Sequence, residues 1–355
     1  MSGDGCERSP LGRGALYLGP RRPGYGGHLS MVGRGRGAAR GYGERNTMKS
    51  GVPLVIVGAG RSGTNFLSHV FEHDDRFWNA YESRYIWNYG QKTLTHDVRK
   101  LDEATAKVRQ FIGRYFEQLS HKHDGRWVVD KTPSNVFRVG FVHEVFPDAK
   151  IIHIIRDGRD NIVSRVHEWY GGRAVNAQRE RGKEASYRLA LIRQRFGHLR
   201  TLVARGNLPA ARWPTFLWDN VSTFSSHFLT GRPRRYAERF PGMDDCLGVY
   251  GLMETAAIQW REGVMRALCE GRRLPAGSYL EVRYEDLLSS PETQWDRIVG
   301  FLGIEEDRRA RDWLLANARR DNFGKWKRQL SDEAVVALEP HVRPTLEFLG
   351  YSWEA

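Results

Sequence analysis

The sequence predicts an α/β fold, with a central parallel sheet of about five strands and helices on both faces. Short apolar runs bounded by Pro or Gly alternate with longer segments in which apolar residues recur at helical spacing. An apolar run without polar alternation is typical of a strand that is buried on both faces of a sheet. Strands and helices in alternation favour parallel pairing through helical crossovers.

The elements follow in order along the chain. The strand candidates are residues 54–57, 127–129 and 151–155, with residues 279–284 as a less apolar candidate. The helix candidates are residues 64–72, 104–121, 136–145 and 161–169. Residues 170–250 interrupt this alternation. They are rich in Arg and aromatic residues, and we expect a mostly helical insertion there, which either covers a ligand site or is a surface elaboration.

Residues 1–47 differ in composition from the rest of the chain. They hold 13 of the 38 glycines and eight arginines, with only three acidic residues. Such a segment buries too little apolar surface to offset its chain entropy, so we predict disorder. A solvated leader, or a true start at Met48, is favoured over an RNA-binding tail. Residues 48–355 form the predicted domain.

Bulk composition limits the function classes. The formal net charge of +13 suits an acidic partner, such as a phosphorylated nucleotide. The three cysteines are odd in number and lack CxxC spacing, which fits a reducing compartment. The sequence has no run of 18 uncharged apolar residues, so we do not expect a membrane span. We therefore expect a cytoplasmic protein. Its oligomeric state is not readable from the sequence.

A glycine-rich loop, residues 58–65 (GAGRSGTN), follows the first strand and opens a helix. Glycines let backbone N–H groups close around a phosphate, and a helix N-terminus adds partial positive charge. The glycines fit the dinucleotide fingerprint GxGxxG, which needs an acidic residue at the end of a second strand about 20 residues later. Residues 77–82 (FWNAYE) occupy that position, and we do not predict a strand end there.

The same loop fits the glycine spacing of the Walker P-loop, GxxxxGK[ST]. However, Thr64 stands in place of the Lys and Asn65 in place of the hydroxyl that binds Mg²⁺. Arg61 can supply the cation instead, and the Ser62 and Thr64 hydroxyls can donate hydrogen bonds. Those features suit a phosphosulfate bound without metal. Arg-Ser-Gly-Thr in a strand–loop–helix resembles the 5′-phosphosulfate loop of the sulfotransferases that use 3′-phosphoadenosine 5′-phosphosulfate (PAPS).

That resemblance implies a P-loop-like three-layer fold. It also implies which residues of the loop bind the nucleotide donor. They are Gly60, Arg61, Ser62, Gly63, Thr64 and Asn65.

A second basic corner follows the strand candidate at residues 151–155. Arg156 stands at the strand end, and Ser164 lies about two helical turns further on. An Arg fork and a hydroxyl suit a terminal phosphate dianion. The pattern R-D-x-R-D…S resembles the 3′-phosphate site of sulfotransferases, with the Ser eight residues after the Arg. We expect Asp157, Arg159 and Asp160 to form a charged turn and helix cap.

Glu82 is the candidate general base. Residues 81–86 (YESRYI) resemble the Glu-x-Arg segment of the protein-tyrosine sulfotransferases, whose Glu is the proposed base. The alternative is a surface Glu or a structural pair with Arg84. Sulfuryl transfer needs a group that accepts the proton of the acceptor hydroxyl.

Lys131 is the candidate for neutralising charge on the transferring group. It lies in residues 130–135 (DKTPSN), which resemble the family's K-x-P segment. Pro133 and Thr132 are also expected to begin and cap a helix. Arg61 is expected to share the catalytic role of Lys131, because the leaving bridge oxygen must be neutralised.

Two later segments complete the resemblance. Tyr284 lies in R-Y-E-D-L, where the family's Tyr is near the nucleotide. Lys325 lies in residues 322–327 (NFGKWK), which resemble the family's closing loop over the donor, while Trp326 is expected to pack. The whole resemblance runs from about residue 52 to residue 351.

The resemblance implies a PAPS-dependent sulfotransferase, with PAPS as donor substrate, a hydroxyl-bearing acceptor and no metal. A glycan, lipid, peptide tyrosine or small molecule could each supply the hydroxyl, and the insertion at residues 170–250 is expected on the acceptor side. The alternatives are a P-loop-type kinase or NTPase and a non-catalytic nucleotide- or RNA-binding module.

Overall fold

The computed structural model describes residues 49, 51–92, 95–169 and 238–354. Its sheet has five parallel strands in the order β2-β3-β1-β4-β5. The strands are β1 (Leu54–Val57), β2 (Phe77–Tyr81), β3 (Trp127–Lys131), β4 (Lys150–Ile155) and β5 (Tyr279–Arg283). The predicted α/β fold with a parallel sheet of about five strands is confirmed.

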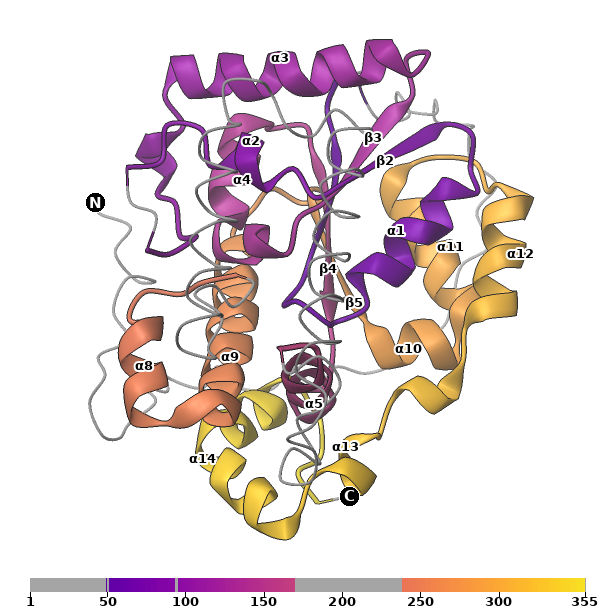
Figure 1. The fold of residues 1–355 in the computed structure, drawn as a ribbon. Helices are drawn as coiled ribbons and strands as arrows, with labels where there is room; N and C mark the ends of the chain where they lie inside the picture. Colours follow the sequence, from indigo (N-terminus) through magenta and orange to yellow (C-terminus); the bar gives the residue numbers. More distant parts are fainter. Residues whose placement is uncertain (1–48, 50, 93–94, 170–237, 355) are drawn as a thin grey trace, which may run out of the picture. The chain divides into compact units, whose positions relative to one another are not determined.

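Helices cover both faces of this sheet (Figure 1). The first half of the chain contributes α1 (Thr64–Glu72), α2 (Arg84–Trp87), η1 (Leu101–Glu103), α3 (Ala106–Lys122), η2 (Pro133–Phe137), α4 (Val139–Val145) and α5 (Gly158–Trp169). The second half contributes α8 (Met243–Val249), α9 (Gly251–Gly271), α10 (Tyr284–Ser289), α11 (Pro291–Leu302), α12 (Arg308–Asn317), η4 (Arg320–Asn322), α13 (Trp326–Gln329) and α14 (Asp332–Phe348).

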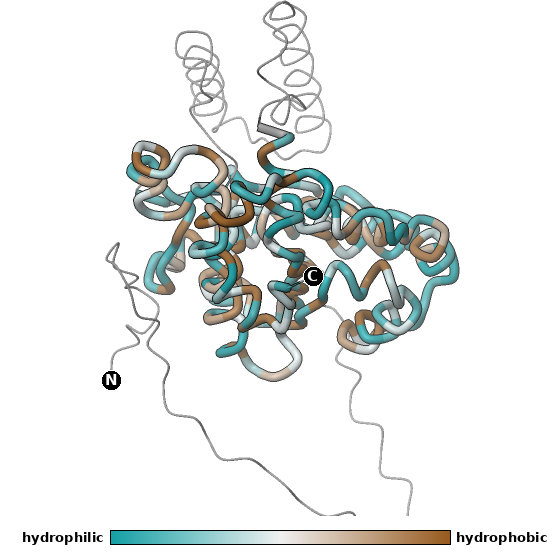
Figure 2. The backbone as a smooth tube through the Cα atoms, turned by 90° about the horizontal axis from the view of Figure 1, so that it is seen from below, coloured by the Kyte–Doolittle hydropathy of each residue, from teal (hydrophilic) through white to brown (hydrophobic). Residues whose placement is uncertain are grey.

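Alternate residues of β1 point into two separate cores. Val55 and Val57 pack with α3, α4 and η2 on one face. Leu54 and Ile56 pack with α1, α10, α11 and α12 on the other face. Figure 2 shows hydrophilic and hydrophobic residues alternating along the helices, as expected for helices that cover a sheet. Because both faces are covered, β1 is a continuous apolar run and not an alternating one.

A third core lies where β4 ends. Ala59 and Ile155 pack there with apolar residues of α5, α9 and α14. This core includes residues of the loop after β1 and of the end of β4. Residues of α14 therefore pack directly against the ends of β1 and β4.

The prediction that no strand ends within residues 77–82 is wrong. Residues 77–81 form β2, and Glu82 directly follows it. β2 is an edge strand with a register irregularity between Asn79 and Tyr81. The Asn79 side chain takes part in the local bonding, since its Oδ1 accepts from the Tyr81 N–H (2.9 Å) and its Nδ2 donates to the Ser68 carbonyl (3.2 Å). Because the polar Asn79 interrupts the apolar residues of this strand, the hydrophobicity pattern did not predict it.

The dinucleotide fingerprint still fails, but for a different reason. In the dinucleotide fold the second strand lies beside the first, whereas here β2 pairs with β3, and β3 lies between β2 and β1. Glu82 is thus two strands away from the glycine loop.

The helix expected over residues 136–145 is divided in two. η2 ends at Phe137 and α4 begins at Val139, because Arg138 between them has φ −154°. Pro133 opens η2 as expected, but the Thr132 hydroxyl does not cap it and instead donates to Asp130 Oδ1 (3.0 Å).

Two further expectations fall outside the described residues. These are the predicted disorder of residues 1–47 and the helical insertion up to residue 237; beyond it, α8 is helical as expected. In the described ranges, no helix is both long and apolar enough to cross a membrane.

We expect His153 of β4 to make the stability depend on pH. The residue is fully buried, its Nδ1 lies 2.6 Å from the Tyr279 hydroxyl, and burial lowers its pKa to about 4. The unfolded chain, with a His pKa of about 6.5, binds the proton more readily, so stability falls as pH drops from about 6.5 towards 4.

Replacing His153 by Gln removes this contribution to the pH dependence of stability. Between pH 7 and pH 5 the free energy of unfolding of the wild type should fall by about 2 kcal/mol more than that of His153→Gln. Urea unfolding at both pH values measures the difference. Parallel pH curves for the two proteins would contradict the assignment.

Candidate functional site

The sequence-predicted site residues lie where the five strands end. The carboxyl ends of parallel strands meet at one edge of a sheet, and open α/β sheets bind ligands at that edge. Glu82 follows β2, Lys131 ends β3, the glycine loop follows β1, Arg156 follows β4 and Tyr284 follows β5. The topology therefore gathers segments that are more than 200 residues apart in the chain.

The glycine loop holds an unusual backbone. Arg61 and Gly63 both have left-handed φ angles, of 73° and 93°. A Cβ on Gly63 would lie 2.2 Å from the Tyr284 ring, so only glycine fits between the loop and α10. Ser62 and Thr64 are buried, whereas Arg61 is exposed.

The first turn of α1 is oriented for an anion. Its N-cap residue is Gly63, and no side chain of the described residues caps this helix. The first N–H groups of a helix have no intrahelical acceptor, and they carry the positive end of the helix dipole. The arrangement suits a phosphate or sulfate group, as the sequence predicted.

Buried side chains clamp the loop at Gly60. The Gly60 N–H donates to Glu238 Oε1 (2.6 Å), and its carbonyl accepts from Asn161 Nδ2 (2.8 Å) and an Arg165 guanidinium nitrogen (2.8 Å). Arg165 also pairs with Glu238 at 2.6 Å, with both side chains 1% exposed. The loop is thereby joined to α5 and to Glu238.

The sequence pattern did not predict this clamp on Gly60. Asn161 and Arg165 are four residues apart in a predicted helix, which places them on one face and gives a weak signal. Glu238 gave no signal, since 178 positions separate it from Gly60.

The two basic corners lie together. Arg156 donates to the Arg61 carbonyl (3.0 Å) and to the Asn322 carbonyl (2.7 Å), and Arg61 Nε donates to Ser164 Oγ (3.1 Å). The Arg156 guanidinium lies 4.9 Å from the Tyr284 ring centroid. Burial raises the pKa of the Tyr284 hydroxyl, so this side chain is neutral at physiological pH. One nucleotide-sized ligand could thus contact both corners.

The segment around Lys325 is tied to the same place. Asp160 accepts hydrogen bonds from the Gly324 N–H (2.6 Å) and the Trp326 N–H (2.9 Å). Lys325 Nζ donates to Asn322 Oδ1 (3.0 Å). Trp326 is buried, with the Arg159 guanidinium 4.0 Å from its ring centroid, so it packs as expected.

The expectation for Asp160 was incomplete. Asp157 does accept from the Arg159 N–H (2.8 Å), as a helix-capping residue does, but Asp160 bonds a loop 164 positions away. The sequence pattern showed a charged turn and could not show which distant backbone it would hold.

Glu82 and Lys131 form an ion pair, with Nζ 2.9 Å from Oε1. The Lys131 side chain is 4% exposed, while that of Glu82 is 37% exposed and so accessible from solvent. Arg84, the alternative partner of Glu82, pairs with Asp97 at 2.9 Å. The structure therefore pairs two of the three side chains that the sequence proposed for catalysis, while the third, Arg61, bonds to Ser164.

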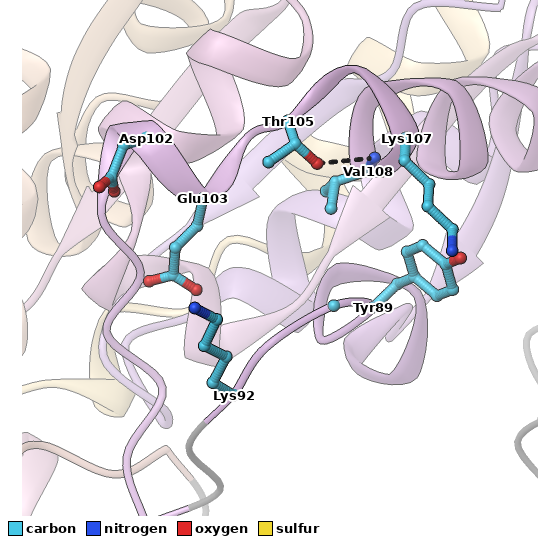
Figure 3. Close-up of a pocket in the computed structure, with 8 residues that line it drawn as sticks. Tyr89, Lys92, Asp102, Glu103, Thr105, Lys107 and Val108 are labelled. Atoms are coloured by element: carbon cyan, nitrogen blue, oxygen red, sulfur yellow. Dashed lines mark hydrogen bonds between the residues drawn. The ribbon is translucent and has the colours of Figure 1, made fainter.

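A cavity of about 440 Å³ lies apart from these groups. Figure 3 shows it between the segment after α2 and the start of α3, with Lys92 directed towards Glu103. None of the sequence-predicted site residues lines it. It plays no part in the site at the strand ends.

Comparison with known proteins identifies the family. Residues 53–215 and 242–308, more than half of the chain, match the sulfotransferase family profile. The chain belongs to the sulfotransferase family. The expected α/β architecture and the sulfotransferase resemblance are both confirmed.

Individual sulfotransferases resemble parts of the chain. Human carbohydrate sulfotransferase 1 is 33% identical over 91 residues, covering 21% of this chain and 22% of that protein. The omega-hydroxy-beta-dihydromenaquinone-9 sulfotransferase Stf3 of Mycobacterium bovis is 24% identical over 249 residues, covering 68% of this chain and 46% of that protein. The chain spans less than half of the length of these curated relatives. The sulfotransferase domain from the curacin biosynthetic pathway matches at 13% identity with a TM-score of 0.46, covering 85% of this chain and 98% of that one.

Gly63→Ala tests the contact between the loop and Tyr284. The added Cβ would meet the ring at 2.2 Å in a backbone conformation that alanine avoids, so we expect a loss of about 2 kcal/mol or more in unfolding free energy. Gly113→Ala in α3 is the matched control, because its Cβ would meet nothing within 4 Å. It should gain up to about 1 kcal/mol. Equal urea midpoints for the two variants would refute the tight fit of the loop.

Proposed function

We propose that this sulfotransferase moves a sulfuryl group from PAPS to an acceptor hydroxyl and releases adenosine 3′,5′-bisphosphate. The observation that carries the proposal is the junction of the two basic corners at the strand ends, through Arg61, Arg156 and Ser164. PAPS carries anionic groups at its 5′ and 3′ positions, and the two corners would bind one group each.

The donor side is built around β1, β4 and β5. The first turn of α1, with Arg61, Ser62 and Thr64, would hold the 5′-phosphosulfate. Arg156 and Ser164 would hold the 3′-phosphate, since a guanidinium fork suits a phosphate dianion. Tyr284 and Lys325 would contact the rest of the nucleotide. Arg156 needs little reorganisation, because its bonds to two backbone carbonyls already fix its orientation.

The chemical step would take place at the Glu82–Lys131 pair. Glu82 would accept the proton of the acceptor hydroxyl while the oxygen of that hydroxyl forms a bond to sulfur. The bond between sulfur and the bridging oxygen would break, and that oxygen would stay on the 5′-phosphate. Lys131 and Arg61 would neutralise the negative charge that develops there. No proton from another group is needed, because the phosphate leaves as an anion.

The acceptor is defined only as a hydroxyl. The carbohydrate and menaquinone sulfotransferases among the relatives act on chemically different hydroxyl compounds, so the resemblance favours neither class. Transfer of radiolabelled sulfate from PAPS into an extract of glycans, lipids and metabolites would identify the class. A kinase or NTPase would instead bind ATP with Mg²⁺ in calorimetry, in preference to metal-free bisphosphate.

Arg156→Ala tests donor binding. Loss of charge-assisted hydrogen bonds to a phosphate costs about 1.5–3 kcal/mol, so we expect binding of adenosine 3′,5′-bisphosphate to weaken at least 10- to 100-fold. Isothermal calorimetry without metal measures it. Arg272→Ala, which removes an exposed ion pair with Glu281, is the control and should bind normally. Undiminished binding by Arg156→Ala would rule out the proposed 3′-phosphate site.

Glu82→Gln tests the base. The amide keeps the size of the side chain and cannot accept the proton, so the rate of sulfate transfer should fall about 100- to 10,000-fold. Bisphosphate binding should persist. Glu72→Gln, an exposed glutamate of α1, is the control and should transfer normally. A Glu82→Gln enzyme that keeps its wild-type rate would show that the proton leaves by another group.

A further inference from the structure

Asp130, at the end of β3, is a fully buried carboxylate held by neutral donors. Its Oδ2 accepts from Trp87 Nε1 (2.9 Å) and Asn135 Nδ2 (3.1 Å), and its Oδ1 accepts from the Thr132 hydroxyl (3.0 Å). These donors come from α2, from η2 and from the end of β3. One side chain therefore joins three segments at the edge of the sheet that carries the site.

Ionisation of this carboxylate is less favourable in the folded chain than in the unfolded chain. Burial raises the pKa of Asp130 to about 6, so the folded chain holds the proton more tightly than the unfolded chain does. The destabilisation is complete above about pH 6 and disappears as the pH falls towards the unfolded pKa near 4. The three hydrogen bonds of Asp130 therefore do not fully offset the cost of burying its charge.

The hydrogen bonds of Asp130 connect the segments that carry Glu82 and Lys131. Asp130 directly precedes Lys131 in β3. The Thr132 hydroxyl, which donates to Asp130, accepts from the N–H of Ser83 (2.8 Å), and Ser83 directly follows Glu82. Trp87 lies on the same segment, at the end of α2. The backbones on which Glu82 and Lys131 stand are thus joined through one buried carboxylate.

We propose that Asp130 is a positioning residue for the transfer step, holding the turn between β2 and α2 against the end of β3 so that Glu82 and Lys131 stay in contact. The inference rests on the proposed function for the roles of those two side chains. Misplacement of a reacting group by about 1 Å can cost about 100-fold in rate. Hydrogen bonds that fix the two backbones would prevent such a shift.

Three variants separate this role from simple stabilisation. Asp130→Ala leaves Trp87 and Asn135 without their acceptor, and Thr132→Val removes the acceptor of the Ser83 N–H. Both should lower kcat about 10- to 100-fold. The dissociation constant of adenosine 3′,5′-bisphosphate should stay within about twofold, because the residues proposed to bind it around β1, β4 and β5 lie outside the hydrogen bonds of Asp130.

Asp130→Asn is the conservative rescue. Its amide oxygen can accept from Trp87 and Asn135, and its amide nitrogen can donate to the Thr132 hydroxyl, which still accepts from Ser83. This variant should recover kcat to within about fivefold of the wild type, since the geometry is kept. Its stability at neutral pH should equal or exceed that of the wild type.

Glu270→Ala is the control for loss of a largely buried, hydrogen-bonded carboxylate. Glu270 of α9 accepts from the Gly140 N–H (2.8 Å) and pairs with Arg266 (3.1 Å). This variant should lose stability with kcat unchanged. Calorimetry with the bisphosphate gives the fraction of Asp130→Ala chains that still bind. If kcat falls only as much as that fraction falls, or does not fall, the positioning role is overturned.

Crystal structures of the wild type and Asp130→Ala test the same inference without turnover. The Glu82–Lys131 pair should remain in hydrogen-bond contact in the first and separate in the second. An unchanged pair in Asp130→Ala would overturn the inference, whatever the activity. Failure of the wild type to transfer sulfate from PAPS would instead refute the proposed function alone.

Discussion

The parallel pairing of β1 with both β3 and β4 determines where the functional side chains can lie. Every strand of this sheet runs in the same direction, so each chain segment leaving a strand does so at the same edge. The apolar residues of β1 and β4 fix that arrangement by filling the cores on both faces. The glycine loop, the basic corner at Arg156 and the Glu82–Lys131 pair are neighbours because of this constraint.

Buried carboxylates then fix the loops that the sheet only brings near. Glu238 holds the Gly60 N–H, Asp160 holds two N–H groups of the segment around Lys325, and Asp130 holds the turn after Glu82. An ionised group is costly to bury unless its hydrogen bonds are satisfied. Rigid loops reduce the reorganisation needed when an anionic ligand binds.

The proposed site divides into a side that would bind the donor and a side that would react. The residues proposed to bind the donor come from the ends of β1, β4 and β5, where aromatic and guanidinium groups stack. The residues proposed for proton and charge transfer come from the ends of β2 and β3. Arg61 belongs to both sides, since its loop lies between them. Loop 58–65 is therefore where binding of the donor would be coupled to chemistry.

The sequence by itself determined the strands of the interior, the glycine loop and the two basic corners. Those features depend on local composition, such as apolar runs like Leu54–Val57 and glycines where the backbone turns. Tertiary structure alone decided that Phe77–Tyr81 is an edge strand, that Arg84 pairs with Asp97, and that Glu238 clamps Gly60. Hydrogen bonds between segments far apart in the chain leave no periodic trace in the sequence, because each depends on how the sheet brings the two segments together.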